Sequence, residues 1–402
     1  MGIPTQTVSS ELCTGVSMLG GLRKAARLAF GLGPAVGRSD SNRVRAALAG
    51  GAWYSREEAI MGTAIRVELW SKQRRSAEEA MGAVIEEMHR IDRTMSPFKP
   101  ESELSRINRD AGREAVPVSR EIFELLARSL DFSRLSAGAF DITFASAGHL
   151  YDYRERIRPT AEALAQACGA IGYQNLLLDE QACTVRFARQ GMRIDLGGFA
   201  KGYAVDRGAA LLRQRGIEHA IVSAGGDSHI VGDRGGRPWT IGVRDPRRPG
   251  ELAAVLPLKD VAISTSGDYE RYFDEDGVRF HHILDPRTGA SPSSVRSVTI
   301  IAPDGLTSEG LSKSVFVLGV EQGMRLIDAQ RDVDAVVVDA AGVLHYSAGL
   351  REGGPTSTPG RAQVRAQEMA PAAQSAVTER VEARAGVQSQ STAESSAQKV
   401  TV

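Results

Sequence analysis

Hydrophobic and polar residues recur along the chain with two periods, one typical of strands and the other of helices. Apolar and polar side chains alternate over residues 63–70, which predicts a half-buried strand. Downstream, apolar residues recur at steps of three and four, which predicts an amphipathic helix that packs on a sheet and ends at Pro97. The residues on its apolar face are Met81, Val84, Met88, Ile91 and Met95.

The same periodicities extend through the middle of the chain. Helices are predicted at residues 119–136, 161–171, 201–215 and 308–319, with Ser119 as a candidate N-cap and Gly216 as a helix-ending glycine. Short strands are predicted at residues 176–178, 184–187, 192–196, 220–223, 239–244, 261–264, 298–302, 333–339 and 344–350. Runs of strands with helices set between them predict an α+β fold of mixed sheets with packed helices in two intertwined lobes.

The ends of the chain differ from its middle. Residues 1–56 carry seven Lys or Arg against Glu11 and Asp40, so we predict a basic, poorly ordered extension over residues 1–58. An export signal that ends near Ala47-Leu48-Ala49 is the alternative. Residues 353–402 contain no Leu, Ile, Phe, Tyr, Trp or Cys, which predicts a disordered tail over residues 351–402. One folded domain is therefore expected at residues 59–350.

Composition excludes several classes of partner and site. The 402 residues carry 49 Lys or Arg and 49 Asp or Glu, a balance that argues against a nucleic-acid partner for the whole chain. The three cysteines form no C-x-x-C pair, which argues against a zinc knuckle or a disulfide scaffold. No run of about 18 uncharged apolar residues occurs, so no transmembrane span is expected.

Residues 195–202 place two glycines between a predicted strand and a predicted helix. Glycines at such a junction let backbone N–H groups approach an anion, and the helix N-terminus and Lys201 add positive potential. This arrangement suits a phosphate or pyrophosphate. An equally favoured interpretation is that Gly197-Gly198 only turns the chain and that Lys201 is solvated. For Asp141, which follows Gly138, the favoured interpretation is a cap on the next turn.

Three further segments place polar residues close together. Residues 223–227 predict a hairpin or bulge without chemistry. Residues 265–269 and 281–289 bring hydroxyls, histidines and carboxylates together, as a phosphoryl-transfer site requires, although a turn with a structural histidine is the alternative. Glu309 and Lys313 stand four residues apart on a predicted helix, which by itself favours an ordinary surface ion pair.

Eight motifs occur in a fixed order along residues 59–350. They are Met61-Gly62-Thr63, Met95-Ser96-Pro97-Phe98, residues 102–108, Gly138-Ala139-Phe140-Asp141, residues 195–203, Ala224-Gly225-Gly226-Asp227, Thr265-Ser266-Gly267-Asp268-Tyr269 and residues 282–289. Together they resemble the FAD:protein FMN transferase family, also called ApbE. The resemblance implies a flavin cleft between the two lobes, and a reaction that moves the FMN half of FAD onto a Thr or Ser hydroxyl of a target flavoprotein and releases AMP.

The resemblance also implies site residues. Those expected to bind FAD are Met61, Phe98, Ala139, Phe140, Asp141, Asp195, Lys201 and Ile283. His282 is expected to transfer a proton or orient the acceptor hydroxyl, and Lys201 to neutralise pyrophosphate charge. We expect Asp141, Asp195, Lys201 and His282 to converge around one dinucleotide.

The family's magnesium site is altered in this sequence. The implied ligands are the carbonyl of Gly198 and the carboxylate of Glu309, but Lys313 replaces a further expected ligand, and an ammonium cannot coordinate a cation. Either Lys313 supplies its own charge in place of Mg²⁺, or Glu309 holds a displaced ion while Lys313 points away.

Two other activities and two compartments remain open. The alternatives to FMN transfer are an FAD pyrophosphatase that yields FMN and AMP, and a catalytically impaired module that binds flavin or a partner. The resemblance implies the periplasm or cell envelope; without a signal at the N-terminus, the cytoplasm is expected.

Overall fold

The computed structural model describes residues 50–351, so most of the predicted extension and tail lies outside the described residues. Residues 52–58, assigned above to the extension, instead belong to strand β1 (Ala52–Ile60). This strand pairs in antiparallel fashion with β2 (Thr63–Ser71) through a turn at Met61 and Gly62, whose φ angles of 54° and 69° are both positive. The prediction missed β1 because it is a largely exposed edge strand rich in charge.

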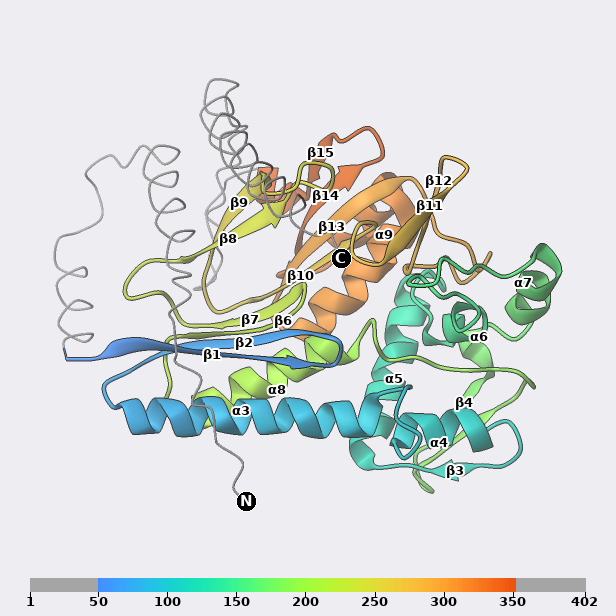
Figure 1. The fold of residues 1–402 in the computed structure, drawn as a ribbon, viewed down its shortest axis with the longest axis horizontal. Coiled ribbons are helices and arrows are strands. Elements are labelled where there is room, and N and C mark those ends of the chain that lie inside the picture. Colours follow the sequence, from blue (N-terminus) through green and yellow to red (C-terminus); the bar gives the residue numbers. More distant parts are fainter. Residues whose placement is uncertain (1–49, 352–402) are drawn as a thin grey trace, which may run out of the picture. The chain divides into compact units, whose positions relative to one another are not determined.

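An eight-stranded antiparallel sheet organises the structure (Figure 1). Its order is β1, β2, β6 (Ala220–Ala224), β7 (Asp227–Val231), β10 (Ala262–Gly267), β13 (Val295–Ala302), β14 (Asp334–Asp339) and β15 (Leu344–Tyr346). Alternate residues of each strand face opposite sides of the sheet. In β6, for example, Val222 joins one hydrophobic cluster and Ile221 contacts the other.

Three helices pack side by side on one face of this sheet. They are α3 (Arg74–Met95), α8 (Ala200–Gln214) and α9 (Gly305–Asp328), with a kink in α9 at Gly319. The opposite face is covered by the hairpin of β8 (Trp239–Arg244) and β9 (Leu252–Leu258). A second hairpin, β11 (Tyr272–Glu275) and β12 (Val278–His281), precedes His282. The central strands of the sheet are therefore buried on both faces, whereas the edge strand β1 is largely exposed, and this burial explains the many apolar residues of β13 and β14.

A second group of elements is inserted between α3 and α8. It contains α4 (Glu103–Asp110), β3 (Val116–Pro117), α5 (Arg120–Leu135), η1 (Ile142–Phe144), α6 (Ala145–Gly148), α7 (Ala161–Cys168), η2 (Tyr173–Asn175), β4 (Leu176–Asp179) and β5 (Thr184–Phe187). Strands β3, β5 and β4 form a small sheet. The short helix α10 (Ala348–Arg351) follows β15. The predicted α+β class with mixed sheets and packed helices is confirmed.

Local end signals of the helices were predicted correctly. The side chain of Ser119 accepts a hydrogen bond from the Ile122 N–H at 3.3 Å and caps α5. Gly216 follows α8 with a φ of 72°. The predicted strand at 344–350 is shorter than expected, because β15 ends at Tyr346 and α10 begins at Ala348.

The strand predicted at residues 192–196 does not form, although apolar and polar residues alternate along this segment. Its backbone is instead hydrogen-bonded by other groups. The side-chain amide of Asn108 donates to the Ile194 carbonyl at 2.9 Å and accepts from the Ile194 N–H at 2.8 Å. The Asp195 N–H donates to the Ile142 carbonyl at 3.0 Å. These distant partners hold the segment that leads to Gly197-Gly198.

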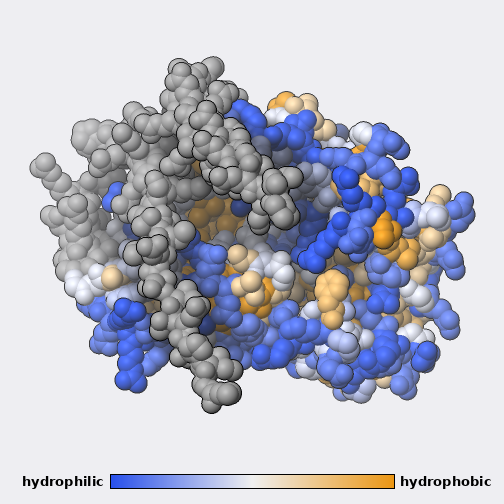
Figure 2. Space-filling model, viewed as in Figure 1, coloured by the Kyte–Doolittle hydropathy of each residue, from blue (hydrophilic) through white to orange (hydrophobic). Residues whose placement is uncertain are grey.

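The surface of the molecule is mainly hydrophilic. On the face shown in Figure 2, hydrophilic residues predominate and apolar colour is limited to scattered patches. Within residues 50–351, no helix combines the length and the apolar character needed to cross a membrane.

Helices α8 and α9 approach each other closely at two glycines. A Cβ built on Gly202 would lie 2.2 Å from the Gly305 carbonyl oxygen, a backbone atom that cannot rotate away. We therefore expect Gly202→Ala to lower the free energy of unfolding by about 1–3 kcal/mol, measured by urea denaturation. Gly112→Ala is the matched control, because a Cβ there meets nothing within 4 Å. Equal stability of the two variants would contradict this packing.

Candidate functional site

A buried cluster of charges forms where the N-terminal turns of α8 and α9 meet the start of β7. The ammonium of Lys201 donates to Asp227 Oδ2 at 2.5 Å and also to Glu309 Oε1. The Gly202 N–H donates to Glu309 Oε2 at 2.7 Å. Glu309 is 0% exposed, so the predicted surface ion pair is wrong. The prediction that Glu309 and Lys313 stand four residues apart on a helix was correct, but α9 is buried at this turn.

The partners of Lys201 keep it charged. Burial opposes ionisation of this lysine, but the negative charges of Asp227 and Glu309 outweigh that effect and raise its pKa. Ser264 Oγ donates to the other oxygen of Asp227 at 2.5 Å, so both carboxylate oxygens have partners. The ammonium of Lys201 is thus committed to two carboxylates, and its charge is balanced within the protein.

Lys313 extends from α9 into the same cluster. Its Nζ donates to Ser266 Oγ at 2.8 Å and lies 3.8 Å from Glu309 Oε1. Its side chain passes the glycine pair before α8, since a Cβ built on Gly198 would be 3.5 Å from Lys313 Cε. Of the two arrangements considered for Lys313, the one in which it points away from Glu309 is therefore incorrect.

The groups present do not fit the divalent metal that the family resemblance implies. Both carboxylate oxygens of Glu309 already accept hydrogen bonds, from Lys201 and from the Gly202 N–H. The ammonium of Lys313 lies beside Gly198 and Glu309, the two implied ligands, and would repel a cation there. In the described residues, no group of three or more His, Cys, Asp or Glu could hold a metal ion.

His282 lies beside this cluster, after β12. Burial, aided by the positive charges of Lys313 and Arg271, lowers the pKa of His282 to about 3. Its Nδ1 is buried and has no hydrogen-bond partner among residues 50–351. This environment favours the neutral imidazole at pH 7, which is the form of the ring that can accept a proton.

Arg271 connects His282 to Asp195. The Arg271 carbonyl accepts a hydrogen bond from the His282 N–H at 3.1 Å. Burial raises the pKa of Asp195, while the Gly197 N–H and the charge of Arg271 oppose that shift. The guanidinium of Arg271 also lies near the β1–β2 turn, 3.6 Å from a Cβ built on Gly62. Asp195, His282 and the turn at Met61 are therefore neighbours of one arginine.

Asp141 has the local role that was favoured above. Its Oδ1 accepts from the N–H of Thr143 at 2.8 Å and from the Thr143 hydroxyl at 2.7 Å, which caps η1. Its Oδ2 accepts from the Tyr173 N–H at 2.8 Å. Burial raises the pKa of Asp141, and these hydrogen bonds oppose the shift. Asp141 is linked to Asp195 by the hydrogen bond between the Asp195 N–H and the Ile142 carbonyl.

The remaining predicted residues differ in exposure. Ala139, Phe140 and Ile283 are buried in the main hydrophobic cluster, where the Phe140 ring packs against Phe199. Their side chains therefore build the core under the site. Phe98 is 86% exposed, so its ring is open to a ligand.

Two residues of the site, one inside the charged cluster and one beside Asp195, were missed as functional candidates. Asp227 was assigned only to a hairpin, which does form between β6 and β7, but its carboxylate binds Lys201. Arg271 was not considered at all. Asp227 had a signal, since it closes the Ala224-Gly225-Gly226-Asp227 motif. Arg271 had none, because only the fold brings it to Asp195.

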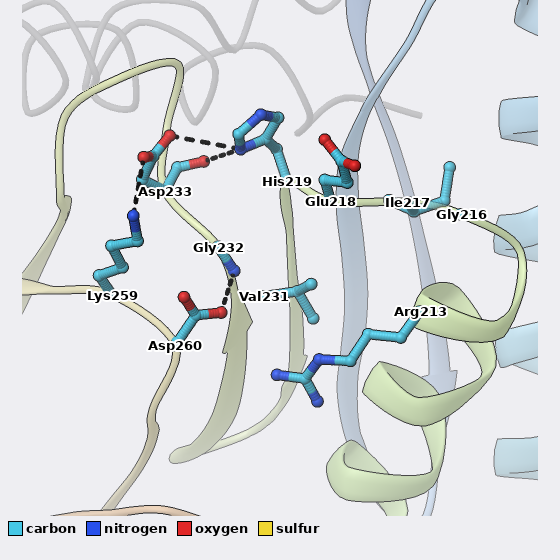
Figure 3. A pocket seen from close by; sticks show the side chains of 10 residues that line it. All are labelled: Arg213, Gly216, Ile217, Glu218, His219, Val231, Gly232, Asp233, Lys259 and Asp260. Atoms are coloured by element: carbon cyan, nitrogen blue, oxygen red, sulfur yellow. Dashed lines mark hydrogen bonds and ion pairs between the residues drawn. The ribbon is translucent and has the colours of Figure 1, made fainter. Parts of the chain in front are cut away.

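A separate polar pocket lies at the far ends of β6 and β7 from Asp227 (Figure 3). It is lined by Arg213, Gly216, Ile217, Glu218, His219, Val231, Gly232, Asp233, Lys259 and Asp260. Asp233 pairs there with Lys259 at 3.3 Å and accepts a hydrogen bond from the His219 ring through its carbonyl. Lys259 thus has its own partner in this pocket and serves below as a control lysine.

Comparison with known proteins identifies the family. A sequence model of the ApbE family matches residues 61–337. The FAD:protein FMN transferase of Klebsiella pneumoniae is 34% identical over 290 residues, which cover 71% of this chain and 89% of that protein. The FAD:protein FMN transferase of Treponema pallidum is 33% identical over 317 residues, 74% of this chain and 87% of that protein.

Solved structures agree with the sequence comparison. The ApbE protein of Thermotoga maritima superposes with a TM-score of 0.70 at 35% identity and covers 75% of this chain and 99% of its own. The flavin transferase ApbE of Vibrio cholerae gives a TM-score of 0.68 at 26% identity over 75% of this chain and 99% of its own. This chain therefore belongs to the ApbE family.

Proposed function

We propose that this protein is an FAD:protein FMN transferase, which moves FMN from FAD to a Thr or Ser hydroxyl of a target flavoprotein and releases AMP. Membership of the ApbE family and the names of the relatives support this activity. The observation that carries the residue assignments is the position of His282, whose N–H donates to the Arg271 carbonyl and whose Nδ1 has no hydrogen-bond partner among residues 50–351. Burial and the charges of Lys313 and Arg271 lower its pKa and favour the neutral ring.

The proposed chemistry is a single phosphoryl transfer. The acceptor oxygen attacks the phosphorus attached to riboflavin, and a new P–O ester bond forms as the anhydride bond to the AMP phosphate breaks. His282 takes the hydroxyl proton, and the electron pair of the broken bond remains on the AMP phosphate oxygen. Positive charge from Lys313 and Arg271 stabilises that developing charge.

Other residues are assigned supporting roles. The exposed Phe98 ring is proposed to contact the isoalloxazine, and Met61 and Asp195 are proposed to line the same flavin site. Lys201 is proposed to act through Glu309 and Asp227 rather than on pyrophosphate directly, because both carboxylates already engage its ammonium. Asp141, Ala139, Phe140 and Ile283 are proposed to shape the site from beneath.

Incubation with FAD and a candidate flavoprotein tests the activity. Covalent flavin fluorescence on the acceptor in a denaturing gel, with AMP released in equal amount, is the expected result. Free FMN with AMP would indicate a pyrophosphatase, and unchanged FAD that is bound would indicate an impaired flavin-binding module. An acceptor in which the target Thr or Ser is replaced by Ala is the control.

The pKa of His282 predicts an unusual pH profile. A base works only in its neutral form, and with a pKa of about 3 His282 stays neutral from pH 8 to pH 5. An ordinary histidine of pKa about 6.5 would lose about 30-fold in its neutral fraction over that range. We expect the rate of transfer, measured at saturating FAD and acceptor, to show no such loss.

A charge variant provides the control for this profile. Lys313→Gln removes one of the positive charges that lower the pKa of His282, so the acid limb of its normalised profile should move to higher pH. A wild-type rate that falls with an apparent pKa near 6.5 would contradict the low pKa of His282, because that is the profile of an ordinary histidine base.

A further inference from the structure

Oxygen atoms surround the ammonium of Lys313 on several sides. Nζ lies 2.8 Å from Ser266 Oγ, 3.4 Å from Ser312 Oγ and 3.8 Å from Glu309 Oε1. Its methylenes run past Gly198. Two hydroxyls and one carboxylate are neighbours typical of a cation, and here the cation is part of the protein.

The charges of this cluster are already balanced. With both lysines protonated and both carboxylates ionised, Lys201 and Lys313 contribute two positive charges, and Asp227 and Glu309 contribute two negative ones. Burial lowers the pKa of Lys313 and raises the pKa of Glu309, and the attraction between the two groups opposes both shifts. A divalent ion added to this set would leave two positive charges without partners in a buried environment, which is costly. The arrangement thus accommodates the ammonium and disfavours a second cation at the same place.

The ammonium is also accessible from the site. The side chain of Lys313 remains 18% exposed, whereas Glu309 behind it is fully buried. Its methylenes lie beside Gly198, in the glycine pair before α8 where backbone N–H groups can approach a phosphate. Lys201, by contrast, is held between two carboxylates.

We propose that Lys313 supplies to the pyrophosphate of FAD the positive charge that a divalent cation would otherwise provide, so that this protein transfers FMN without magnesium. The inference rests on the proposed function. As the anhydride bond breaks, the ammonium keeps its proton and donates hydrogen bonds to the AMP phosphate oxygen, which carries the released electron pair.

The first test compares transfer with and without a chelator. We expect the initial rate of FMN transfer by the wild-type protein in EDTA to be within about twofold of the rate in MgCl₂. A loss of more than about tenfold in EDTA, restored by added Mg²⁺, would overturn the inference.

The second test needs no turnover. Electron paramagnetic resonance of Mn²⁺ is recorded with FAD alone and with FAD plus protein, and we expect the same amount of free Mn²⁺ in both. Stoichiometric binding of Mn²⁺ by the protein, lost in Glu309→Gln, would overturn the inference. Because this readout is independent of activity, a failure of the proposed function, seen as no labelled acceptor in either buffer, is distinguishable from a failure of this inference.

A double variant tests whether removal of the Lys313 ammonium makes the reaction dependent on a divalent cation. Lys313→Thr combined with Glu309→Asp exchanges the ammonium for a hydroxyl and shortens the carboxylate. We expect it to bind Mn²⁺ and to transfer FMN at least about tenfold faster in Mg²⁺ than in EDTA. An unaltered magnesium response would count against the placement of this pair. Lys259→Thr is the matched control, because that lysine pairs with Asp233 in the separate pocket.

A single variant keeps the test decisive if the double variant does not fold. Lys313→Gln retains a donor toward Ser266 but removes the charge, so we expect transfer in EDTA to fall about 10²-fold while circular dichroism is unchanged. Full activity of a folded Lys313→Gln protein in EDTA would show that the ammonium does not supply the charge.

Discussion

Replacing His282 by alanine is expected to leave FAD bound but to slow FMN transfer about 10²- to 10⁴-fold. The imidazole is neutral at pH 7 because burial and the charges of Lys313 and Arg271 lower its pKa to about 3. Its Nδ1 has no hydrogen-bond partner within residues 50–351. Loss of the ring therefore removes a proton acceptor and breaks no hydrogen bond of Nδ1. The measurements are covalent flavin fluorescence on the acceptor and FAD affinity by fluorescence titration.

A histidine outside the site serves as the control for this experiment. His219 binds the Asp233 carbonyl in the separate pocket, so His219→Gln should change neither transfer nor FAD affinity (Figure 3). Transfer by His282→Ala at the wild-type rate would remove His282 from the mechanism. A loss of FAD affinity that accounts for the whole effect would assign the ring to binding.

Lys201→Met is expected to lower the free energy of unfolding by about 3–5 kcal/mol. The substitution preserves the length of the side chain but leaves Glu309, which is fully buried, and Asp227 without their shared cation. Two buried carboxylates close together repel each other, and one must take up a proton for the protein to fold. Urea denaturation at pH 7 measures the loss, and the loss should diminish at lower pH as a carboxylate becomes protonated.

A surface lysine distinguishes this effect from the general cost of losing an ion pair. Lys99 pairs with Asp92 at 2.5 Å, but its side chain is 44% exposed, so Lys99→Met should cost no more than about 1 kcal/mol. Equal losses for the two variants would show that the cluster around Lys201 is not a source of stability. The large loss expected for Lys201→Met also means that its activity must be compared at a temperature where both proteins are folded.

The two experiments separate two kinds of residue in one site. His282 has an unpartnered ring nitrogen and is expected to contribute to rate, while Lys201 is saturated with partners and is expected to contribute to structure. Lys313 lies between them, partly exposed and in contact with Glu309. Because of this difference in partners, we assign contact with the phosphate to Lys313 and not to Lys201.

Local patterns along the sequence were sufficient for much of the fold. Helix periodicity and end signals such as Ser119 and Gly216 depend on neighbours within a few residues, so they can be read without the tertiary structure. The ordered set of glycine-rich motifs was likewise enough to indicate the family and the reaction. The strand expected at residues 192–196 does not form, because the conformation of this segment depends on distant residues. Asn108, more than 80 residues away, supplies the hydrogen bonds of Ile194.

The state of the charged groups was decided only by the tertiary structure. Glu309 and Lys313 have the spacing of a surface pair, and nothing local to α9 shows that the large sheet and α8 bury that turn. Lys201 and Glu309 are far apart in the sequence and meet because Gly202 and Gly305 let two helices approach closely, and Asp227 joins them because α8 packs on β7. Burial and neighbouring charge set the pKa of a side chain, and both depend on long-range packing. The sequence by itself therefore determined which groups were available, and the fold determined which of them are neutral, paired or open to a substrate.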